Sequence, residues 1–362
     1  MTEEKPIVRK APRSAAEKLA RGHFMTRQDF TELLAGFQDP RITELLAGEA
    51  VRVRKKYYGT KVFTRGLIEF TNYCKNNCYY CGIRGANRSA VRYRLTKKEI
   101  LECCREGYWL GFRTFVLQGG EDPFYTDERM ADLVREIKGA YPDCALTLSV
   151  GERSYESYRL LREAGADRYL LRHETADREH YRLLHPEPLT LDNRKRCLMD
   201  LKALGYQTGA GMMVGSPGQT RETLVEDLLF LQELRPQMVG MGPFIPHHDT
   251  CFAKEPAGSV ELTLYLLAIV RLLLPRVLLP ATTALGTLDP LGREKGLAVG
   301  ANVVMPNLSP RRNRKNYDLY DNKICTGEEA AEGFRNLRCR IAAAGYELVM
   351  ERGDYLEEET KG

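Results

Sequence analysis

The feature that most constrains this chain is the segment Cys74–Cys81, with the sequence CKNNCYYC, which places three thiols within eight residues. It comes directly after an apolar, strand-like run, Val62–Phe70. Three thiolates at such close spacing can hold three corners of a [4Fe–4S] cluster, and the fourth iron is then free to bind a small molecule. A closed zinc site needs four ligands, usually two separated pairs, and no second pair follows because Cys103 and Cys104 fall in a helical pattern. The spacing favours an iron–sulfur site over zinc or a chance grouping of structural thiols.

Charge and hydropathy exclude several classes of function. The formal net charge is +5 over 362 residues, with 54 basic and 49 acidic side chains interspersed along the chain. We therefore expect no nucleic-acid partner, since phosphate binding needs clustered Lys and Arg. The most apolar stretch, Leu262–Leu279, is broken by Arg271, Pro275 and Arg276, so we expect no membrane span. Ten Cys without a secretory signal suggest reduced thiols and a cytoplasmic protein.

Three parts are predicted along the chain: a tail and helical extension over residues 1–58, a barrel over 59–305, and a closing loop and helix over 306–362. After Gly59, short apolar strands alternate with amphipathic helices. Eight strands each followed by a helix predict an α/β fold, a (β/α)8 TIM-type barrel, and the segment is long enough for one. The strands are expected at Phe63–Phe70, Thr114–Gln118, Ala145–Val150, Arg168–His173, Gln207–Val214, Met238–Gly242, Leu278–Thr283 and Asn302–Met305.

A doubly wound open sheet is the alternative to the barrel. Glycines and polar groups follow nearly every predicted strand, as expected for a barrel whose active site collects the C-terminal strand ends. Helix starts are predicted from capping patterns at Thr26-x-x-Asp29, Thr96-x-x-Glu99, Thr220 and Thr326-x-x-Glu329.

The first candidate binding groups follow the second and fourth predicted strands. Gln118-Gly119-Gly120-Glu121 offers close backbone approach and an anion, although a plain turn between strand and helix explains it equally well. Arg172 and Glu174 alternate onto one side of the fourth strand, so in a barrel both face the mouth. The alternative for this pair is a surface salt bridge.

Later strands supply weaker candidates. The many glycines of residues 208–218 would weaken an ordinary strand and suit a ligand lying against the backbone. His247 and His248 suggest metal, but neighbours on an extended chain point opposite ways, so we expect an ordered loop wall instead. Thr282 and Thr283 are predicted either to bind a small polar ligand or to cap a helix. A loop with Tyr317 and Tyr320 is predicted to close one end of the barrel.

The Cys spacing, with Tyr80 just before the third Cys, resembles the radical S-adenosylmethionine (radical SAM) superfamily. Longer phrases, among them VLQGGEDP, DRYLLRHET and LPATTALGT, are similar to the HydE family of [FeFe]-hydrogenase maturases over about residues 25–350. Biotin synthase and methylornithine synthase share the barrel and the Cys triad, and such an enzyme with a small organic substrate is the alternative. A cluster-containing scaffold or electron-transfer protein is a second alternative, although a carrier needs no ligand-lined barrel.

This resemblance implies a radical SAM barrel with one [4Fe–4S] cluster and SAM. It implies cluster ligands Cys74, Cys78 and Cys81, SAM contacts Tyr80, Gln118, Gly119, Glu121, Arg172, Glu174, Arg194 and Met212, and a substrate cavity lined by Thr282, Thr283, Tyr317 and Tyr320. The radical formed from SAM carries the chemistry, so no side chain is expected to be catalytic. Some family members have a second cluster, but Cys325 here has no nearby Cys, so we expect none.

The implied reaction is a step in assembling the two-iron subcluster of [FeFe]-hydrogenase. The substrate would be a cysteine-bound iron complex, Fe(CO)2(CN), supplied by the maturase HydG. The implied partners are this small iron-containing substrate, the maturases HydG and HydF, and an electron donor such as ferredoxin or flavodoxin. An oxygen-sensitive cluster further suggests an anaerobic organism.

Overall fold

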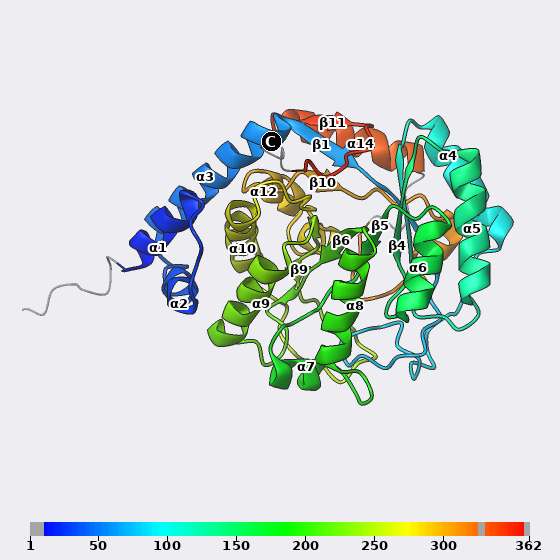
Figure 1. The fold of residues 1–362 in the computed structure, drawn as a ribbon, viewed down its shortest axis with the longest axis horizontal. Coiled ribbons are helices and arrows are strands. Elements are labelled where there is room, and N and C mark those ends of the chain that lie inside the picture. The colour runs from blue at the N-terminus through cyan, green and yellow to red at the C-terminus, as the bar shows by residue number, and fades with distance from the viewer. Residues whose placement is uncertain (1–10, 325–329, 358–362) are drawn as a thin grey trace, which may run out of the picture.

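The computed structural model describes residues 11–324 and 330–357, and a ring of parallel strands lies at its centre (Figure 1). Six strands pair in chain order, each parallel to the next. Helices lie outside them, so the predicted α/β barrel is confirmed. The six strands are β2 (Gly66–Thr71), β3 (Thr114–Gly119), β4 (Ala145–Ser149), β5 (Arg168–Leu170), β6 (Gln207–Ala210) and β8 (Met238–Val239).

Isolated bridges close the ring. Met238 pairs with Leu278, Pro280 with Val303, and Leu67 with Asn307, all parallel. The predicted seventh strand, Leu278–Thr283, is therefore wrong as a full strand. Pro280 has no N–H to donate to a ladder. Thr283 already belongs to helix α11 (Thr283–Leu288), for which Thr282 is the N-cap.

Three other predicted strands are each divided in two. The first is split at Arg65 into β1 (Lys61–Thr64) and β2. The fifth continues after β6 as β7 (Met213–Val214), and the sixth continues after β8 as β9 (Gly242–Pro243). The breaks coincide with a close approach, since a Cβ on Gly211 would lie 1.8 Å from the Gly240 carbonyl oxygen. The eighth predicted strand is shortened to β10 (Val303–Val304).

The barrel helices begin where the capping patterns predicted. Thr96 and Glu99 form a capping box at the start of α4 (Lys97–Trp109), and Thr220 caps α9 (Arg221–Leu234). The predicted cap at Thr326 lies outside the described residues. The other helices are α5 (Asp127–Ala140), α6 (Tyr155–Glu163), α7 (Arg178–Leu184), α8 (Leu191–Ala203), α10 (Val260–Leu273), α12 (Gly292–Leu297), α13 (Arg311–Arg314) and α14 (Ala330–Ala343).

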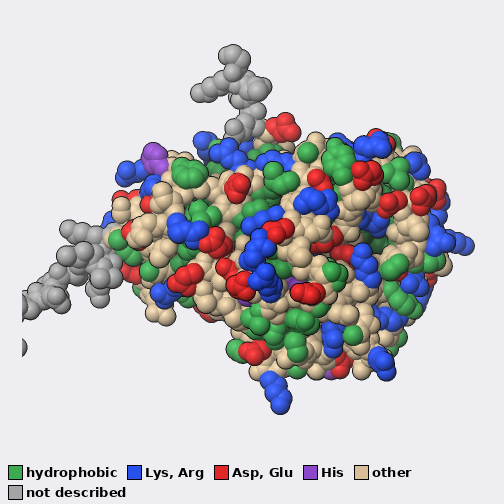
Figure 2. Space-filling model, turned by 60° about the horizontal axis from the view of Figure 1, so that its bottom comes forward, with side chains coloured by type: hydrophobic (Ala, Val, Ile, Leu, Met, Phe, Trp, Pro, Cys, Tyr) green, Lys and Arg blue, Asp and Glu red, His purple; other side chains and the backbone are tan. Residues whose placement is uncertain are grey.

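The N-terminal extension consists of α1 (Ala11–Ala20), α2 (Arg27–Ala35) and α3 (Pro40–Tyr58), at one side of the barrel (Figure 1). The capping box predicted at Thr26 opens α2. Because α3 packs on α10, the apolar residues of α10 are buried on nearly all sides. Among the described residues, none of the helices combines the length and the apolar character that crossing a membrane requires. Basic and acidic side chains are interspersed on the face in Figure 2.

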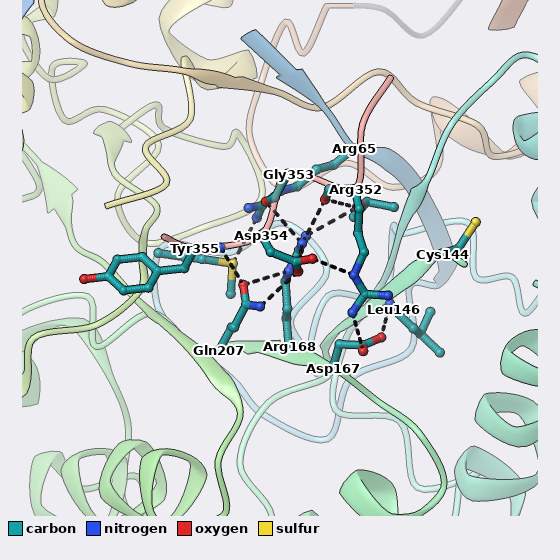
Figure 3. Close-up of polar contacts among 12 residues, drawn as sticks. Arg65, Cys144, Leu146, Asp167, Arg168, Gln207, Arg352, Gly353, Asp354 and Tyr355 are labelled. Carbon is teal, nitrogen blue, oxygen red and sulfur yellow. Dashed lines mark hydrogen bonds and ion pairs between the residues drawn. The ribbon is translucent and has the colours of Figure 1, made fainter. Parts of the chain in front are cut away.

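The chain returns at its end to the N-terminal ends of the barrel strands. Strand β11 (Glu347–Val349), which the sequence analysis missed, pairs in parallel with β1. Residues 352–355 then lie across the starts of β3, β5 and β6, where Arg168 and Gln207 bind them (Figure 3). The C-terminal segment therefore closes this end of the barrel, so any ligand site inside must open at the other end.

Candidate active site

The Cys loop, residues 72–85, follows β2 and is held in place through its backbone. Lys75 N–H donates to the Glu121 carbonyl oxygen at 2.9 Å, Tyr79 N–H to that of Leu184 at 3.0 Å, and Gly82 N–H to that of Leu319 at 3.0 Å. The guanidinium of Arg92 donates to four further carbonyl oxygens, three of them in the loop and one just after it. The loop is thus fixed from three sides without help from its thiols.

Two glycines permit this packing. A Cβ on Gly82 would lie 2.2 Å from the carbonyl oxygen of Asp318, and one on Gly120 would lie 2.2 Å from that of Tyr73. Any other residue at either place would push a neighbouring segment away. Gly82 follows Cys81 directly and Gly120 touches the Cys74 side chain, so both shape the thiol-bearing loop.

The three thiols of the loop are free and partly exposed. Burial raises the pKa of all three, that of Cys81 to about 12, and for Cys78 and Cys81 the neighbouring thiols raise the pKa further. A coordinating metal would favour the thiolate form in such a place. In the described part of the chain, the three sulfur atoms do not all lie within 4.8 Å of one another. At least one pair of these sulfurs is therefore more than 4.8 Å apart, wider than the roughly 3.8 Å between ligands of one zinc ion, which favours a multi-iron cluster.

Arg172 and Glu174 lie at the mouth of the barrel, just beyond the end of β5. Their side chains form an ion pair at 2.8 Å, as expected if both point to one side. The Nε of Arg172 is buried and has no hydrogen-bond partner in the described structure. Glu174 adopts φ +66°, which is rare for a residue other than glycine, and is held there by backbone bonds to Gly211 and Met213.

Arg194 and Glu121 join the mouth from neighbouring elements. The buried Arg194 on α8 donates to the Glu152 carboxylate and to the Arg172 carbonyl oxygen, both at 2.5 Å. Glu121 accepts from Glu152 N–H at 2.9 Å and pairs with Lys75 of the Cys loop at 3.3 Å. The predicted SAM contacts after β3, β5 and on α8 are therefore linked to one another and to the Cys loop.

Tyr80 and Met212 line the same region. The Tyr80 hydroxyl is 3.2 Å from His185 Nε2, and Met212 is fully buried beside Glu174 in an isolated bridge. His185 Nδ1 faces the Tyr181 carbonyl oxygen at 3.0 Å, which only accepts, so Nδ1 carries the proton and Nε2 accepts from Tyr80. Burial lowers the pKa of His185 to about 3, so the ring stays neutral.

A cavity of about 190 Å³ occupies the barrel interior below this mouth. Its wall comes from the ends of β2, β3 and β5, from residues 280–283 and 305–307, and from the last loop and α14. Of the predicted site residues, Gln118, Arg172, Thr282, Thr283 and Tyr320 line it. Gly119 lies beside it at the end of β3, packed against Phe70 and Thr71.

The four predicted substrate residues differ in their present roles. Thr282 lines the cavity and caps α11, accepting from Leu285 N–H at 3.4 Å, so the predicted capping role is confirmed and ligand binding stays a prediction. Thr283 accepts weakly from Arg293 at 3.5 Å. Tyr317 is buried behind the wall near Gln118, and Tyr320 lines the cavity near Thr287. These tyrosines place the last loop at the mouth end.

Several charged cavity residues were missed by the sequence analysis. The buried carboxylate of Glu69 pairs with Lys323 at 2.5 Å and accepts from Asn307 at 2.8 Å. An acidic residue inside an apolar strand was the available signal for Glu69, whereas nothing local distinguishes Lys323. Among the described lining residues, Glu69 is the one acidic group beside four basic ones, which are Arg172, Arg293, Arg314 and Lys323.

The expectation that His247 and His248 point opposite ways is wrong. The chain turns at these residues, and the two rings stack with centroids 4.3 Å apart. Asp249 N–H donates to His247 Nδ1, so His247 Nε2 carries the proton and donates to Asp318 at 3.2 Å. His248 Nδ1 bonds Asp321 at 2.7 Å. The pair ties the last loop to the Cys loop, with His247 against Gly82. Cys325 lies outside the described residues.

Comparison with known proteins agrees with this geometry. The family model of the radical SAM superfamily matches residues 68–231, which include the Cys loop. The chain is 50% identical over 317 residues to the [FeFe] hydrogenase maturase subunit HydE of Thermotoga maritima, covering 88% of this chain and 90% of that protein. It is 31% identical to the 3-methylornithine synthase of Methanosarcina acetivorans, over 83% of this chain and 86% of the relative.

Solved structures show the same fold. Methylornithine synthase (PylB) superposes with a TM-score of 0.81 at 27% identity, covering 92% of this chain and 97% of the other. The hydrogenase maturase HydG superposes with a TM-score of 0.77 at 20% identity, covering 94% and 76%. With a free Cys triad at the mouth of a closed-ended barrel and half its residues shared with a curated maturase, the chain belongs to the radical SAM superfamily and, within it, to the HydE family of [FeFe]-hydrogenase maturases.

Proposed function

We propose that this enzyme acts on a cysteine-bound iron complex, Fe(CO)2(CN), from HydG, in the assembly of the hydrogenase two-iron subcluster. One observation carries the proposal: a small cavity with an excess of basic side chains is lined by Arg172, of the Arg172–Glu174 pair, and by Gln118. When bound, a [4Fe–4S] cluster with SAM supplies a 5′-deoxyadenosyl radical. The residues of the chain bind, orient and enclose the reactants.

Cys74, Cys78 and Cys81 are proposed to hold a single cluster. The proposed SAM contacts surround them: Tyr80, Gln118, Gly119, Glu121, Arg172, Glu174, Arg194 and Met212. The unpartnered Nε of Arg172 fits a carboxylate ligand, since a guanidinium binds carboxylates in paired hydrogen bonds. Glu121 and Glu174 provide acceptors for ammonium and hydroxyl groups.

The charge of the cavity lining supports the proposed substrate. Its basic groups outnumber its acidic ones, which favours an anionic ligand. The hydroxyls of Thr282, Thr283 and Tyr320 offer hydrogen bonds to cyanide and carboxylate, with Tyr317 supporting the wall. The last loop is tied to this space by the Lys323–Glu69 pair.

The proposed partners are HydG as the source of the substrate, HydF as an associated maturase, and ferredoxin or flavodoxin as the electron donor. We also propose a cytoplasmic location in an anaerobic organism, because the cluster loop is partly exposed and its iron would be sensitive to oxygen.

Maturation of hydrogenase in cells tests the substrate. Deleting the gene should leave the hydrogenase inactive while its ordinary iron–sulfur clusters still form. Restoring it with Thr282→Val and Thr283→Val together should retain SAM cleavage but not maturation. The control is Thr26→Val, which removes a helix cap far from the cavity and costs about 1 kcal/mol of stability. Normal maturation in the deletion strain would overturn the proposal.

A methylornithine synthase-like reaction is the second candidate, favoured by the superposition on that enzyme. Its substrate, an amino acid, also carries a carboxylate that the basic cavity would accept. Incubating the reduced enzyme with SAM and lysine separates the two proposals, since only this second activity would give a rearranged amino acid. A biotin synthase-like reaction would instead give the deletion strain a requirement for biotin.

A further inference from the structure

Tyr181 carries a buried hydroxyl that the fold leaves without a partner. The residue lies on α7 and is 1% exposed, and its hydroxyl has no hydrogen-bond partner in the described part of the chain. Leaving such a group buried and unpaired costs free energy, and most buried hydroxyls are paired. An unpaired one beside a binding site is therefore a candidate ligand contact.

The position of Tyr181 relative to the Cys loop is well defined. At the end of α7, the Leu184 carbonyl oxygen accepts from Tyr79 N–H at 3.0 Å. His185 follows, and its ring stacks on that of Tyr181 with centroids 4.0 Å apart while accepting from the Tyr80 hydroxyl. The C-terminal end of α7 is thus joined to the loop between Cys78 and Cys81, and Cys78 is among the titratable groups near Tyr181.

The surroundings of the hydroxyl indicate what it faces. The charged and titratable groups that act on it are those of Arg194, Glu152, Cys78 and Glu174. The Arg194 guanidinium lies 5.9 Å from its ring centroid. These groups belong to the Cys loop, to the proposed SAM contacts and to Glu152, which binds two of those contacts, so the hydroxyl is near the region where the cluster and SAM are proposed to bind. Tyr80 has similar neighbours, but its hydroxyl is already bonded to His185.

We propose that the Tyr181 hydroxyl donates a hydrogen bond to the methionyl carboxylate of SAM. A neutral, unpaired O–H near a thiol and two carboxylates needs an acceptor, and the carboxylate of bound SAM would supply one. The inference rests on the proposed SAM site. It explains why the hydroxyl has no partner within the protein, because its partner belongs to the ligand.

The test is Tyr181→Phe in the anaerobically reconstituted protein, with SAM and 5′-methylthioadenosine as probes. SAM should bind about tenfold more weakly, the size of one hydrogen bond to a charged acceptor. Methylthioadenosine, which lacks the amino-acid group, should bind as it does to the wild type. Without ligand, iron content should be unchanged and the melting temperature equal or higher, because an unpaired buried hydroxyl has been removed.

Tyr206→Phe is the matched control, since that buried hydroxyl donates to the Tyr158 carbonyl oxygen at 2.7 Å away from the site. It should lower the melting temperature and leave SAM affinity unchanged. Unaltered SAM affinity in Tyr181→Phe, equal weakening of both probes, or loss of iron and stability would each overturn the assignment. Failure of the wild type to bind SAM would instead refute the proposed function.

Discussion

Two arginines four residues apart, at opposite ends of the barrel, are used in opposite ways. Arg168 at the start of β5 is fully buried, and its guanidinium donates to Gln207, Thr114, Arg352, Gly353 and Asp354 (Figure 3). Arg172, just past the end of β5, is a third exposed. Among the described residues its side chain pairs with Glu174 alone, and its Nε has no partner.

The difference separates a structural site from a binding site. Where every donor is satisfied within the chain, the arginine fixes the C-terminal segment and closes the barrel. Where donors remain at the edge of a cavity, the arginine is available for a ligand. Arg65 is an exception at the closed end, since two of its nitrogens have no partner among the described residues and burial lowers its pKa.

The largest expected effect concerns the thiols at the mouth. Reconstituted anaerobically, the protein should hold about four irons per chain, and Cys74→Ala, Cys78→Ala or Cys81→Ala should reduce this nearly to zero. Cys251→Ala is the positional control, because its Sγ lies 3.6 Å from the Tyr79 carbonyl oxygen of the same loop. Iron analysis and absorbance measure the outcome, and loss of the cluster in Cys251→Ala or Cys325→Ala would contradict the ligand assignment.

At the closed end, Arg168→Met should destabilise the fold strongly. Removing one partner of a buried ion pair leaves the other unpaired, at a cost of about 3 kcal/mol here, since Asp354 is partly exposed. The matched change Arg172→Met should cost less, because Arg172 bonds to Glu174, whereas Arg168→Met also loses the bonds to Gln207, Thr114 and two backbone carbonyl oxygens. Urea unfolding measures both free energies. Equal losses would mean that both arginines are structural.

SAM affinity should depend on the two arginines in the opposite way to stability, with the larger loss at Arg172. Arg172→Ala should weaken SAM binding by about 1.5–3 kcal/mol, the value of a hydrogen bond between charged groups, with unchanged iron content. Glu174→Ala should also weaken it, and Glu174→Gln less so. Arg168→Met, measured where the variant is folded, should bind SAM normally. Titration calorimetry decides, and normal binding by both Arg172→Ala and Glu174→Ala would leave that pair a structural ion pair.

The smallest expected effect is a pH dependence of folding stability that comes from Asp354 at the closed end of the barrel. Burial raises the pKa of Asp354, but Arg168, Gln207 and Arg352 lower it more, so the folded value lies below the ordinary one. Its stabilisation is therefore complete above the unfolded pKa of about 3.9 and is lost as the pH falls through the folded value. Asp354→Asn should be less stable near neutral pH and lose less stability on acidification. If the wild type and Asp354→Asn lose stability equally as the pH falls, Asp354 does not contribute in this way.

Much of the barrel could be predicted because it depends on local signals. Apolar runs marked the strands, and Thr-x-x-Glu and related patterns marked helix starts at Thr26, Thr96 and Thr220. The failures depend on distant contacts. Nothing near Glu347–Val349 indicates that it pairs with β1, almost 300 residues earlier. The division of β6 from β7 depends on Gly211 lying against Gly240.

The site residues also divide into those with a local sequence signal and those that depend on distant contacts. The Cys spacing and the Arg172–Glu174 alternation are visible in single segments, and the structure brings them to one mouth. Glu69–Lys323 joins residues 254 positions apart, and the unpaired state of Tyr181 is apparent only once its neighbours are placed. Which side chains keep unused hydrogen-bond donors is a property of the folded chain, so sequence patterns cannot report it.

The most direct test of the account is whether the mouth of the barrel cleaves SAM. The anaerobically reconstituted and reduced protein should convert SAM to 5′-deoxyadenosine and methionine, as measured by chromatography. Cys78→Ala should form none, Arg172→Ala should require more SAM, and Arg168→Met should retain the activity while folded. Iron-loaded, reduced wild-type protein that leaves SAM intact would contradict the central claim that this mouth is a radical SAM active site.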